Sequence, residues 1–313
     1  MADQKKTKSI AREPLPVEQR QKVTILTLQK KKEKKEKAVI ITAYTYPEAL
    51  LADKAGMDVI LVGDSLGMTT LGYKTTIAVT MDDMIAHSRG VWRANKTAFH
   101  IGDMPFMSYQ ESDELAIRNA GRFMQEGGCD AVKIEGAMIS RVKAIADAGI
   151  VVMSHLGLTP QSRAMLGGYR VQGKSKDAAE QILEQAFALQ EAGCRFLLLE
   201  AMPRESAGMI AEQLDIPVYG IGAGDLVDGQ LVIMHDLIGM FFEFKSKFVK
   251  RYCEAGKLVE QALKDYADEV RTGKFPTSEH FYELNDDELE KMLADPKWKY
   301  VIQKHIEKTQ KEK

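Results

Sequence analysis

Five segments of this sequence share one pattern, in which a run of apolar residues ends in an ionisable or metal-binding side chain. The segments close with Asp64, Asp103, Glu135, His155 and Glu200. Apolar, β-branched runs of this length are typical of buried strands, so each segment predicts a strand that leads into a polar loop. In an α/β barrel the carboxyl ends of the strands meet on one face, where the chemistry takes place. The repetition therefore favours a catalytic mouth over five unrelated helix caps.

Three of these side chains are acids that follow consecutive predicted strands. Asp64, Asp103 and Glu135 come after the second, third and fourth strands, which are neighbours if the connections are right-handed and sequential. Oxygen ligands without an adjacent His or Cys suit a hard octahedral cation that takes further ligands from water and substrate. Mg²⁺ is the expected metal, although other divalent ions are possible. The alternative is that each acid caps a helix or pairs with a basic residue, which is less convincing for three acids together.

Three more residues could act on a substrate bound beside the acids. Lys133 lies in the middle of an apolar strand, and a buried lysine must meet an anion or lose its charge. It either pairs with Glu135 on the same strand face or binds a substrate carboxylate. Glu200 ends an apolar run and is expected to be partly desolvated, which suits a general base that abstracts a proton. His155 either supports this site or only bonds a carbonyl in a turn.

Strand and helix patterns alternate along the middle of the chain, which predicts βα units and a parallel sheet. We expect strands at 38–43, 58–62, 98–102, 131–134, 150–154, 195–199, 216–221 and 230–234. Helix starts are marked by a capping box at Thr45 and Glu48 and by a cap at Ser112. Eight units match a (β/α)8 barrel. An open doubly wound sheet is the alternative, but no G-x-G-x-x-G turn follows the first strand.

The length and composition suit an enzyme of small molecules. The 313 residues fit one barrel-sized domain with short tails, or two ordinary domains. The 43 basic and 45 acidic residues nearly cancel, so no overall field attracts nucleic acid or anionic lipid. The 3 cysteines form no C-x-x-C pair, which fits reduced thiols and argues against zinc bound by thiolates. No apolar run reaches the roughly 18 residues of a membrane span. We expect a soluble cytoplasmic protein.

The two ends of the chain differ in composition from the predicted barrel. Residues 1–21 are expected to form a flexible tail, residues 22–282 the barrel, and residues 283–313 a charged extension, either a helical appendage or a partner-binding tail. The basic run from Lys30 to Lys37 could bind RNA or a membrane. Because the remaining charges cancel, we favour the solvated face of a helix that begins near Thr24, with Glu partners three and four residues away.

Seven motifs, in order, closely resemble the 3-methyl-2-oxobutanoate (ketopantoate) hydroxymethyltransferase family. They are V-G-D-S-L-G-M at 62–68, D-M-P-F at 103–106, V-K-I-E-G at 132–136, H-L-G-L-T-P-Q-S at 155–162, G-G-Y-R-V-Q-G at 167–173, G-I-G-A-G at 220–224 and D-G-Q at 228–230. The resemblance runs from about residue 23 to about residue 281. It implies a phosphoenolpyruvate/pyruvate-like (β/α)8 TIM barrel that assembles into a homo-oligomer, commonly a decamer.

The resemblance also implies an activity and the residues that perform it. The family transfers a hydroxymethyl group from the co-substrate 5,10-methylenetetrahydrofolate to 3-methyl-2-oxobutanoate, which gives 2-dehydropantoate and tetrahydrofolate in pantothenate biosynthesis. The reaction passes through a metal-stabilised enolate. Carried over position by position, the metal ligands are Asp64 and Asp103, with Glu135 completing the metal shell either directly or through water. Ser65 and Lys133, with the two Asp residues, are then the substrate-binding groups.

Glu200 is the proton acceptor that the resemblance implies, and His155 keeps a supporting role. The chain departs from the family at Thr45, where Asp is common, and at Ala201, where Cys is frequent. Thr caps a helix as Asp does, so these departures concern the folate pocket or the assembly rather than the core reaction.

Two alternatives stay open at this point. One is another Mg²⁺-dependent, enolate-forming barrel enzyme of the phosphoenolpyruvate mutase or lyase type. Such an enzyme uses a reactive Cys on a mobile loop, and none of Cys129, Cys194 and Cys253 lies at a strand-end loop of the predicted mouth. The other is a non-enzymatic scaffold that binds partners through its basic and C-terminal tails.

Overall fold

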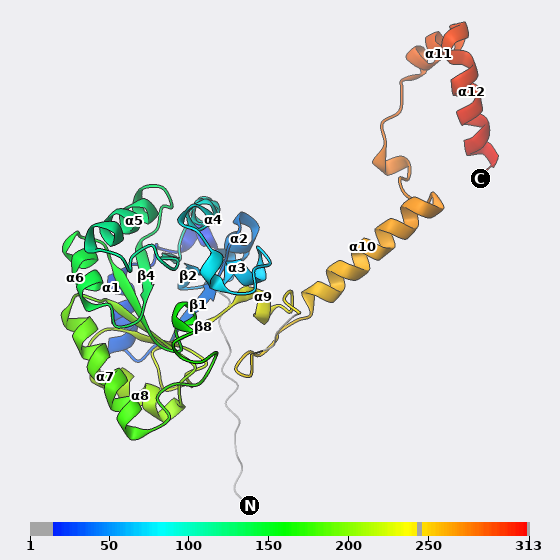
Figure 1. Ribbon diagram of the computed structural model, residues 1–313. Helices are drawn as coiled ribbons and strands as arrows, with labels where there is room; N and C mark the ends of the chain where they lie inside the picture. The colour runs from blue at the N-terminus through cyan, green and yellow to red at the C-terminus, as the bar shows by residue number, and fades with distance from the viewer. Residues whose placement is uncertain (1–14, 243–245, 312–313) are drawn as a thin grey trace, which may run out of the picture. The chain divides into compact units, whose positions relative to one another are not determined.

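The computed structural model describes residues 15–242 and 246–311 and contains a closed barrel of eight parallel strands (Figure 1). Each strand pairs with its neighbours in sequence, and β8 closes the ring on β1. The strands are Ala38–Thr42 (β1), Val59–Val62 (β2), Phe99–Asp103 (β3), Ala131–Glu135 (β4), Val152–Gly157 (β5), Phe196–Glu200 (β6), Val218–Ile221 (β7) and Gly229–Val232 (β8). The predicted (β/α)8 barrel is confirmed, and closure excludes the open sheet.

Helices surround the ring of strands, as Figure 1 shows for α4 to α8. The α-helices are Ile25–Glu33 (α1), Tyr46–Lys54 (α2), Leu66–Thr69 (α3), Met81–Ala94 (α4), Asp113–Gln125 (α5), Ile139–Asp147 (α6), Lys176–Glu191 (α7), Arg204–Gln213 (α8), Met234–Leu237 (α9), Ala255–Thr272 (α10), Asp286–Ala294 (α11) and Pro296–Lys311 (α12). Short 3-10 helices lie at Val17–Gln19 (η1), Thr76–Ala78 (η2), Pro160–Ser162 (η3) and Ser278–His280 (η4).

The chain divides into two compact units. The barrel unit ends at Ala255, and a second unit that begins at Gly256 contains nearly all of α10 together with α11 and α12. The predicted C-terminal extension, residues 283–313, therefore contains two helices within its described part. Most of the predicted N-terminal tail, residues 1–14, lies outside the described residues.

The helix caps lie where the sequence predicts them. The Thr45 side chain accepts a hydrogen bond from the backbone N–H of Glu48, and Glu48 Oε2 accepts one from the N–H of Thr45 at 3.1 Å. Ser112 caps α5 by accepting from Leu115 at 3.1 Å. Each cap satisfies backbone donors that the first turn of a helix leaves unpaired. Thr45 thus makes the same local contact that an Asp would make.

The interior of the barrel is apolar at the amino ends of the strands. The Phe196 ring packs edge-on against Phe99 with ring centroids 5.6 Å apart, and stacks on Tyr219 at 5.9 Å. Leu28 of α1 is buried in the same cluster. Because alternate residues of a strand share a face, the interior series of β3 runs from Phe99 through Ile101 to Asp103. Apolar packing below therefore supports polar groups at the carboxyl ends.

The basic run near the N-terminus contacts the barrel rather than solvent alone. Helix α1 starts after Thr24, as predicted. The Lys31 ammonium lies 3.0 Å from Asp58, and that of Lys32 lies 2.8 Å from Asp228. The sequence predicts that Glu residues within the run pair with its lysines, but at these two positions the partners are acids of the barrel instead. These ion pairs give the run a structural role.

One strand differs from its predicted position in a way that matters for the site. The expected fifth strand, 150–154, ends before His155, whereas β5 extends to Gly157. The ladder continues because Gly157 lies opposite Glu200 of β6. Gly157 has φ +86°, and a Cβ there would overlap the Glu200 carbonyl oxygen. Glycine at this position therefore allows β5 and β6 to approach closely beside the predicted base.

We predict that Gly157→Ala costs more unfolding free energy than Gly149→Ala. Both glycines have a left-handed φ, +86° and +84°, but a Cβ at Gly149 meets no atom within 4 Å. Gly149→Ala should cost about 1–2 kcal/mol from the backbone conformation alone. Gly157→Ala should cost at least about 3 kcal/mol, because overlap adds to the same strain. Urea denaturation of both variants measures the difference, and equal losses would contradict the close approach.

Candidate active site

The structure brings five of the predicted residues together at the carboxyl ends of four adjacent strands. They are Asp103 on β3, Lys133 and Glu135 on β4, His155 on β5 and Glu200 on β6. The register places Asp103 opposite Lys133 and Glu135 opposite His155. Each of the first four is at most 4% exposed, while the Glu200 side chain is 16% exposed. The strand ends thus form a buried, charged cluster with Glu200 at its more open side.

Lys133 is the cation at the centre of this cluster. Its Nζ lies 2.7 Å from each carboxylate oxygen of Asp103 and 3.4 Å from Oε1 of Glu135. Burial alone would lower the pKa of Lys133, but the charges of Asp103 and Glu135 raise it, so the side chain stays an ammonium. The predicted pairing with Glu135 is present. The shorter contacts go to Asp103, because the register between β3 and β4 sets these two residues side by side.

The acids of the cluster have different electrostatic environments. Burial and then the nearby charges of Asp103 and Glu135 raise the pKa of Asp64 well above its usual range. Burial also raises the pKa of Asp103, although Lys133 opposes that effect. For Glu135, burial is outweighed by Lys133 and by His155, which lower its pKa to about 2. Glu135 is therefore firmly ionised, whereas the negative charges of the neighbouring acids disfavour ionisation of Asp64.

His155 lies between two carboxylates. Its Nδ1 is 3.4 Å from Glu135 Oε1, and its Nε2 is 3.3 Å from Glu200 Oε2. Burial works against a charged ring, but the two flanking carboxylates raise the pKa of His155 to about 9. The imidazolium thus lies between the acid cluster and the predicted base and not against a turn carbonyl, and its supporting role stays a prediction.

Ser65 is held by a tyrosine that the sequence reasoning missed. The Ser65 hydroxyl lies 2.8 Å from the Tyr44 hydroxyl, and the Tyr44 ring stacks on His235 with centroids 5.4 Å apart. Burial raises the pKa of Tyr44, so its hydroxyl remains protonated and can donate. Tyr44 directly follows the predicted first strand, and a polar side chain at that strand end could have indicated a residue of the site.

Gln161 is a second residue without a predicted role, although it lies within one of the seven motifs. Its side-chain nitrogen donates to Oδ2 of Asp64 at 3.0 Å, and its backbone N–H donates to Oε2 of Glu135 at 2.9 Å. The motif placed it in a loop after the fifth strand. The contacts of Gln161 with Asp64 and Glu135 become visible only in the folded structure of that loop.

The residues present fit a divalent cation by charge and by donor type. Within residues 15–242 and 246–311, no three His, Cys, Asp or Glu side chains are grouped so that they could hold a metal ion by themselves. The backbone N–H of Asp64 nevertheless donates to Oδ2 of Asp103 at 3.2 Å, so these two acids are adjacent. When all are ionised, the four acids of the mouth outnumber Lys133 and protonated His155 by two charges. A doubly charged ion with oxygen ligands from water or substrate would balance that excess.

The cysteines lie away from this cluster. Cys194 is buried and donates to the carbonyl of Phe196 at 2.8 Å, at the start of β6. Cys129 is buried with its sulfur 3.7 Å from Nε2 of His100, and burial raises the pKa of its thiol. Cys253 is exposed and lies near the end of the barrel unit. None therefore provides a nucleophile at the acid cluster.

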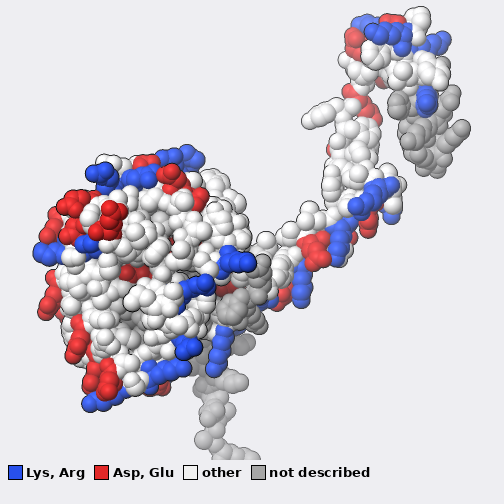
Figure 2. All heavy atoms as spheres, in the orientation of Figure 1, with Lys and Arg blue, Asp and Glu red and all other residues white. Residues whose placement is uncertain are grey.

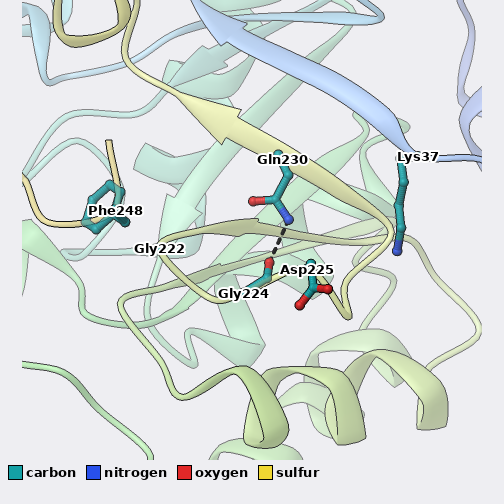
Figure 3. Close-up of a pocket in the computed structure, with 6 residues that line it drawn as sticks. All are labelled: Lys37, Gly222, Gly224, Asp225, Gln230 and Phe248. Carbon is teal, nitrogen blue, oxygen red and sulfur yellow. Dashed lines mark hydrogen bonds between the residues drawn. The ribbon is translucent and has the colours of Figure 1, made fainter. Parts of the chain in front are cut away.

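A separate hollow lies on the barrel surface beside β8. Figure 3 shows that it is bounded by the loop between β7 and β8, with Gln230 donating to the carbonyl of Gly224 at 2.7 Å. It measures about 460 Å³ and is lined by Lys37, Gly222, Gly224, Asp225, Gln230 and Phe248. None of the predicted site residues lines it, so it is distinct from the acid cluster.

The visible face of the barrel carries charged side chains of both signs (Figure 2). On the face of the barrel in Figure 2, basic and acidic side chains are mixed around the edge, and the centre is mostly uncharged. No helix within the described part of the chain is long and apolar enough to cross a membrane.

Solved structures identify the class of barrel. A phosphonopyruvate hydrolase structure aligns with a TM-score of 0.55 at 11% identity, covering 86% of this chain and 94% of that one. A 2,3-dimethylmalate lyase, described as a member of the PEP mutase/isocitrate lyase superfamily, aligns with a TM-score of 0.53 at 14% identity over 85% and 96% of the two chains. At these identities the likeness shows the fold alone: a TIM barrel of the kind that this superfamily uses.

Sequence comparison then identifies the family. The model of the ketopantoate hydroxymethyltransferase family matches residues 22–278. The 3-methyl-2-oxobutanoate hydroxymethyltransferase of Moorella thermoacetica is 53% identical over 84% of this chain and 99% of its own length. That of Syntrophomonas wolfei is 49% identical over 87% and 99%. The chain belongs to the ketopantoate hydroxymethyltransferase family and is a transferase, which confirms the resemblance and argues against a non-enzymatic scaffold.

We predict that His155 makes the stability of this protein fall with rising pH. The folded-state pKa of about 9 exceeds the ordinary value of 6.5, so the contribution is fully present below pH 6.5 and is lost as the pH rises through 9. Compared with His155→Gln, the parent should lose about 3 kcal/mol of its advantage between pH 6 and pH 10. Denaturant unfolding at several pH values measures it. A constant difference between parent and variant would show that folding leaves the pKa of His155 at its ordinary value.

Proposed function

We propose that this enzyme transfers a hydroxymethyl group from 5,10-methylenetetrahydrofolate to 3-methyl-2-oxobutanoate, giving 2-dehydropantoate and tetrahydrofolate in pantothenate biosynthesis. Curated relatives at about half identity carry the name of this activity, which supports the proposal. The observation that carries the mechanism is the row of charges from Asp103 through Lys133, Glu135 and His155 to Glu200. In this row Glu200, a carboxylate able to accept a proton, lies beside the acids proposed to bind the cation. The active form is proposed to be a homo-oligomer.

The residues divide the work between binding the keto acid and moving its proton. Asp64 and Asp103 would hold a divalent cation, preferably Mg²⁺, with Glu135 as the outer carboxylate of that site. Bound there, the cation would polarise the keto group and stabilise negative charge on its oxygen. Lys133 and the Ser65 hydroxyl would orient the keto acid, with Tyr44 fixing that hydroxyl at 2.8 Å. Glu200, the most exposed acid of the cluster, would take the proton from C3.

The carbon left at C3 would then bond to the methylene carbon of the folate, whose two C–N bonds break. A water molecule supplies the hydroxyl oxygen of the product, and the C3 proton and one proton of that water end on the two nitrogens of tetrahydrofolate. His155 would stay between Glu135 and Glu200, so the base keeps its position while it is protonated and deprotonated. The rival is a lyase or mutase that also forms an enolate but uses no folate. The buried positions of Cys129 and Cys194 weigh against the reactive-Cys version of that rival.

Deuterium exchange separates the steps of this proposal. The enzyme is incubated with 3-methyl-2-oxobutanoate and Mg²⁺ in deuterium oxide, and exchange at C3 is followed by proton NMR. Exchange without folate supports enolisation, and 2-dehydropantoate formed on addition of 5,10-methylenetetrahydrofolate supports the transfer. Absence of exchange with or without the folate would refute the proposed chemistry, whereas exchange without product would favour the rival.

We predict that Glu200→Gln abolishes most C3 exchange and turnover while leaving keto-acid binding nearly intact. The amide keeps the size of the side chain but cannot accept the proton, and loss of a general base typically costs a hundred- to ten-thousand-fold in rate. Affinity for the keto acid should change less than about tenfold, or about 1.4 kcal/mol. Rate and calorimetric measurements on one preparation test both statements. Exchange near the parental rate would assign the base elsewhere, with His155 the next candidate.

We predict that Asp64→Asn and Asp103→Asn both weaken Mg²⁺ binding, but that only Asp103→Asn destabilises the fold. Asp64 is buried next to two other acids, so removing its charge should stabilise the fold or leave it unchanged. Asp103 is the closest partner of buried Lys133, and breaking such a pair costs about 3–5 kcal/mol. Calorimetric titration with Mg²⁺ measures the affinity of the two variants, and thermal unfolding measures their stability. Parental Mg²⁺ and keto-acid affinity in Asp64→Asn would exclude this aspartate as a ligand.

A further inference from the structure

Gln161 is buried at the acid cluster, and every polar group of its side chain is used. The side chain comes from η3, in the segment that follows β5, and the residue is 5% exposed. Its Nε2 donates to Asp64 Oδ2 and to the carbonyl of Met104, both at 3.0 Å. Its Oε1 accepts from the Tyr109 hydroxyl at 2.7 Å and from Gln110 at 3.3 Å. An amide offers two donors and one carbonyl acceptor, and all are used here.

The direction of these hydrogen bonds fixes which end of the amide faces Asp64. The backbone N–H of Glu135 donates to the Tyr109 oxygen at 3.0 Å, so the Tyr109 proton is free to go to Gln161 Oε1. The Met104 carbonyl can only accept, so it requires the nitrogen of Gln161. If the amide were flipped so that its oxygen and nitrogen changed places, the oxygen would face two other acceptors, Asp64 Oδ2 and the Met104 carbonyl. The chain of donors therefore runs from β4 through Tyr109 and Gln161 to Asp64.

The same residue also holds the second acid. The backbone N–H of Gln161 donates to Glu135 Oε2 at 2.9 Å, and the other oxygen of Glu135 faces Lys133 and His155, each at 3.4 Å. Asp64 differs, because among the described residues no hydrogen bond reaches its Oδ1. Gln161 thus occupies one oxygen on each of two acids and leaves Oδ1 of Asp64 for another ligand.

We propose that Gln161 is a positioning residue that orients Asp64 and Glu135 toward the cation and couples the segment after β5 to cation binding. The proposal rests on the cation site of the proposed function. A donor that holds one carboxylate oxygen fixes the direction of the other, and such supporting hydrogen bonds typically change metal affinity by tenfold to a hundredfold. The segment also touches the strand of the base, since the N–H of Leu158 donates to the Glu200 carbonyl at 2.9 Å.

The first test compares Gln161→Leu with the parent by calorimetric titration with Mg²⁺. Leucine has a similar size but donates nothing to Asp64, so Mg²⁺ should bind about tenfold to a hundredfold more weakly. Gln172→Leu is the matched control, because Gln172 lies in the same loop and its amide donates to Arg170 rather than to an acid. The control should bind Mg²⁺ like the parent. Equal affinity of Gln161→Leu and the parent would overturn the proposal.

A second variant covers the case in which Gln161→Leu does not fold. Tyr109→Phe removes the hydroxyl that donates to Gln161 Oε1 and accepts from the backbone N–H of Glu135. The amide therefore keeps its contact with Asp64, but the hydrogen-bond chain that orients it is broken. Mg²⁺ affinity should fall by about threefold to tenfold. An unchanged affinity in this variant would contradict the orienting role of the hydrogen-bond chain.

Two further readouts separate positioning from a general loss of structure. In Gln161→Leu, saturating Mg²⁺ should restore kcat to within about threefold of the parent, while the Mg²⁺ concentration for half-maximal rate rises. Hydrogen exchange of residues 158–162 should slow when Mg²⁺ is added to the parent but not when it is added to the variant. A kcat that stays low at every Mg²⁺ concentration, or equal slowing in both proteins, would overturn the coupling. A parent that binds no Mg²⁺ would refute the cation site itself, and that failure appears before any variant is compared.

Discussion

The site depends on one interaction, the buried ammonium of Lys133 held between carboxylates of two neighbouring strands. Its Nζ contacts both oxygens of Asp103 on β3, at 2.7 Å, and one oxygen of Glu135 on its own strand. A buried charge is tolerated only when partners surround it, so these contacts require the exact pairing of β3 with β4. Closure of the barrel supplies that pairing, because each strand is held by two neighbours and none can shift alone.

The charged layer is costly for stability, and the apolar layer beneath it offsets that cost. Phe99, Phe196 and Tyr219 fill the amino-terminal half of the barrel, and Leu28 of α1 adds to the same cluster. Packing of this kind does not depend on the groups at the mouth, so an acid such as Asp64 can remain in an unfavourable environment. Unfavourable electrostatics of this kind are common at functional sites, where activity rather than stability sets the residue.

Much of this could be predicted from the sequence, because strand periodicity and strand ends are local features. Alternation of inward residues is enough to set Asp103, Glu135 and Glu200 on one face once a barrel is assumed. The partners could not be predicted. That Lys133 prefers Asp103 depends on the register between two strands, which the sequence does not state. The contacts of Gln161 with Asp64 depend on the path of a loop, since the two residues are far apart in sequence.

The division of these groups between strands and a loop suits the two-substrate transfer that we propose. Asp103, Glu135 and Glu200 end strands of a closed barrel, so their positions are fixed before any substrate arrives. Gln161 and Leu158 belong to the segment between β5 and α7, and through them this segment contacts both the acid cluster and β6, the strand of the proposed base Glu200. Elements outside the barrel core open more readily than the core strands. Rigid strands can thus keep the backbone positions of these acids fixed while the adjacent segment responds to what is bound.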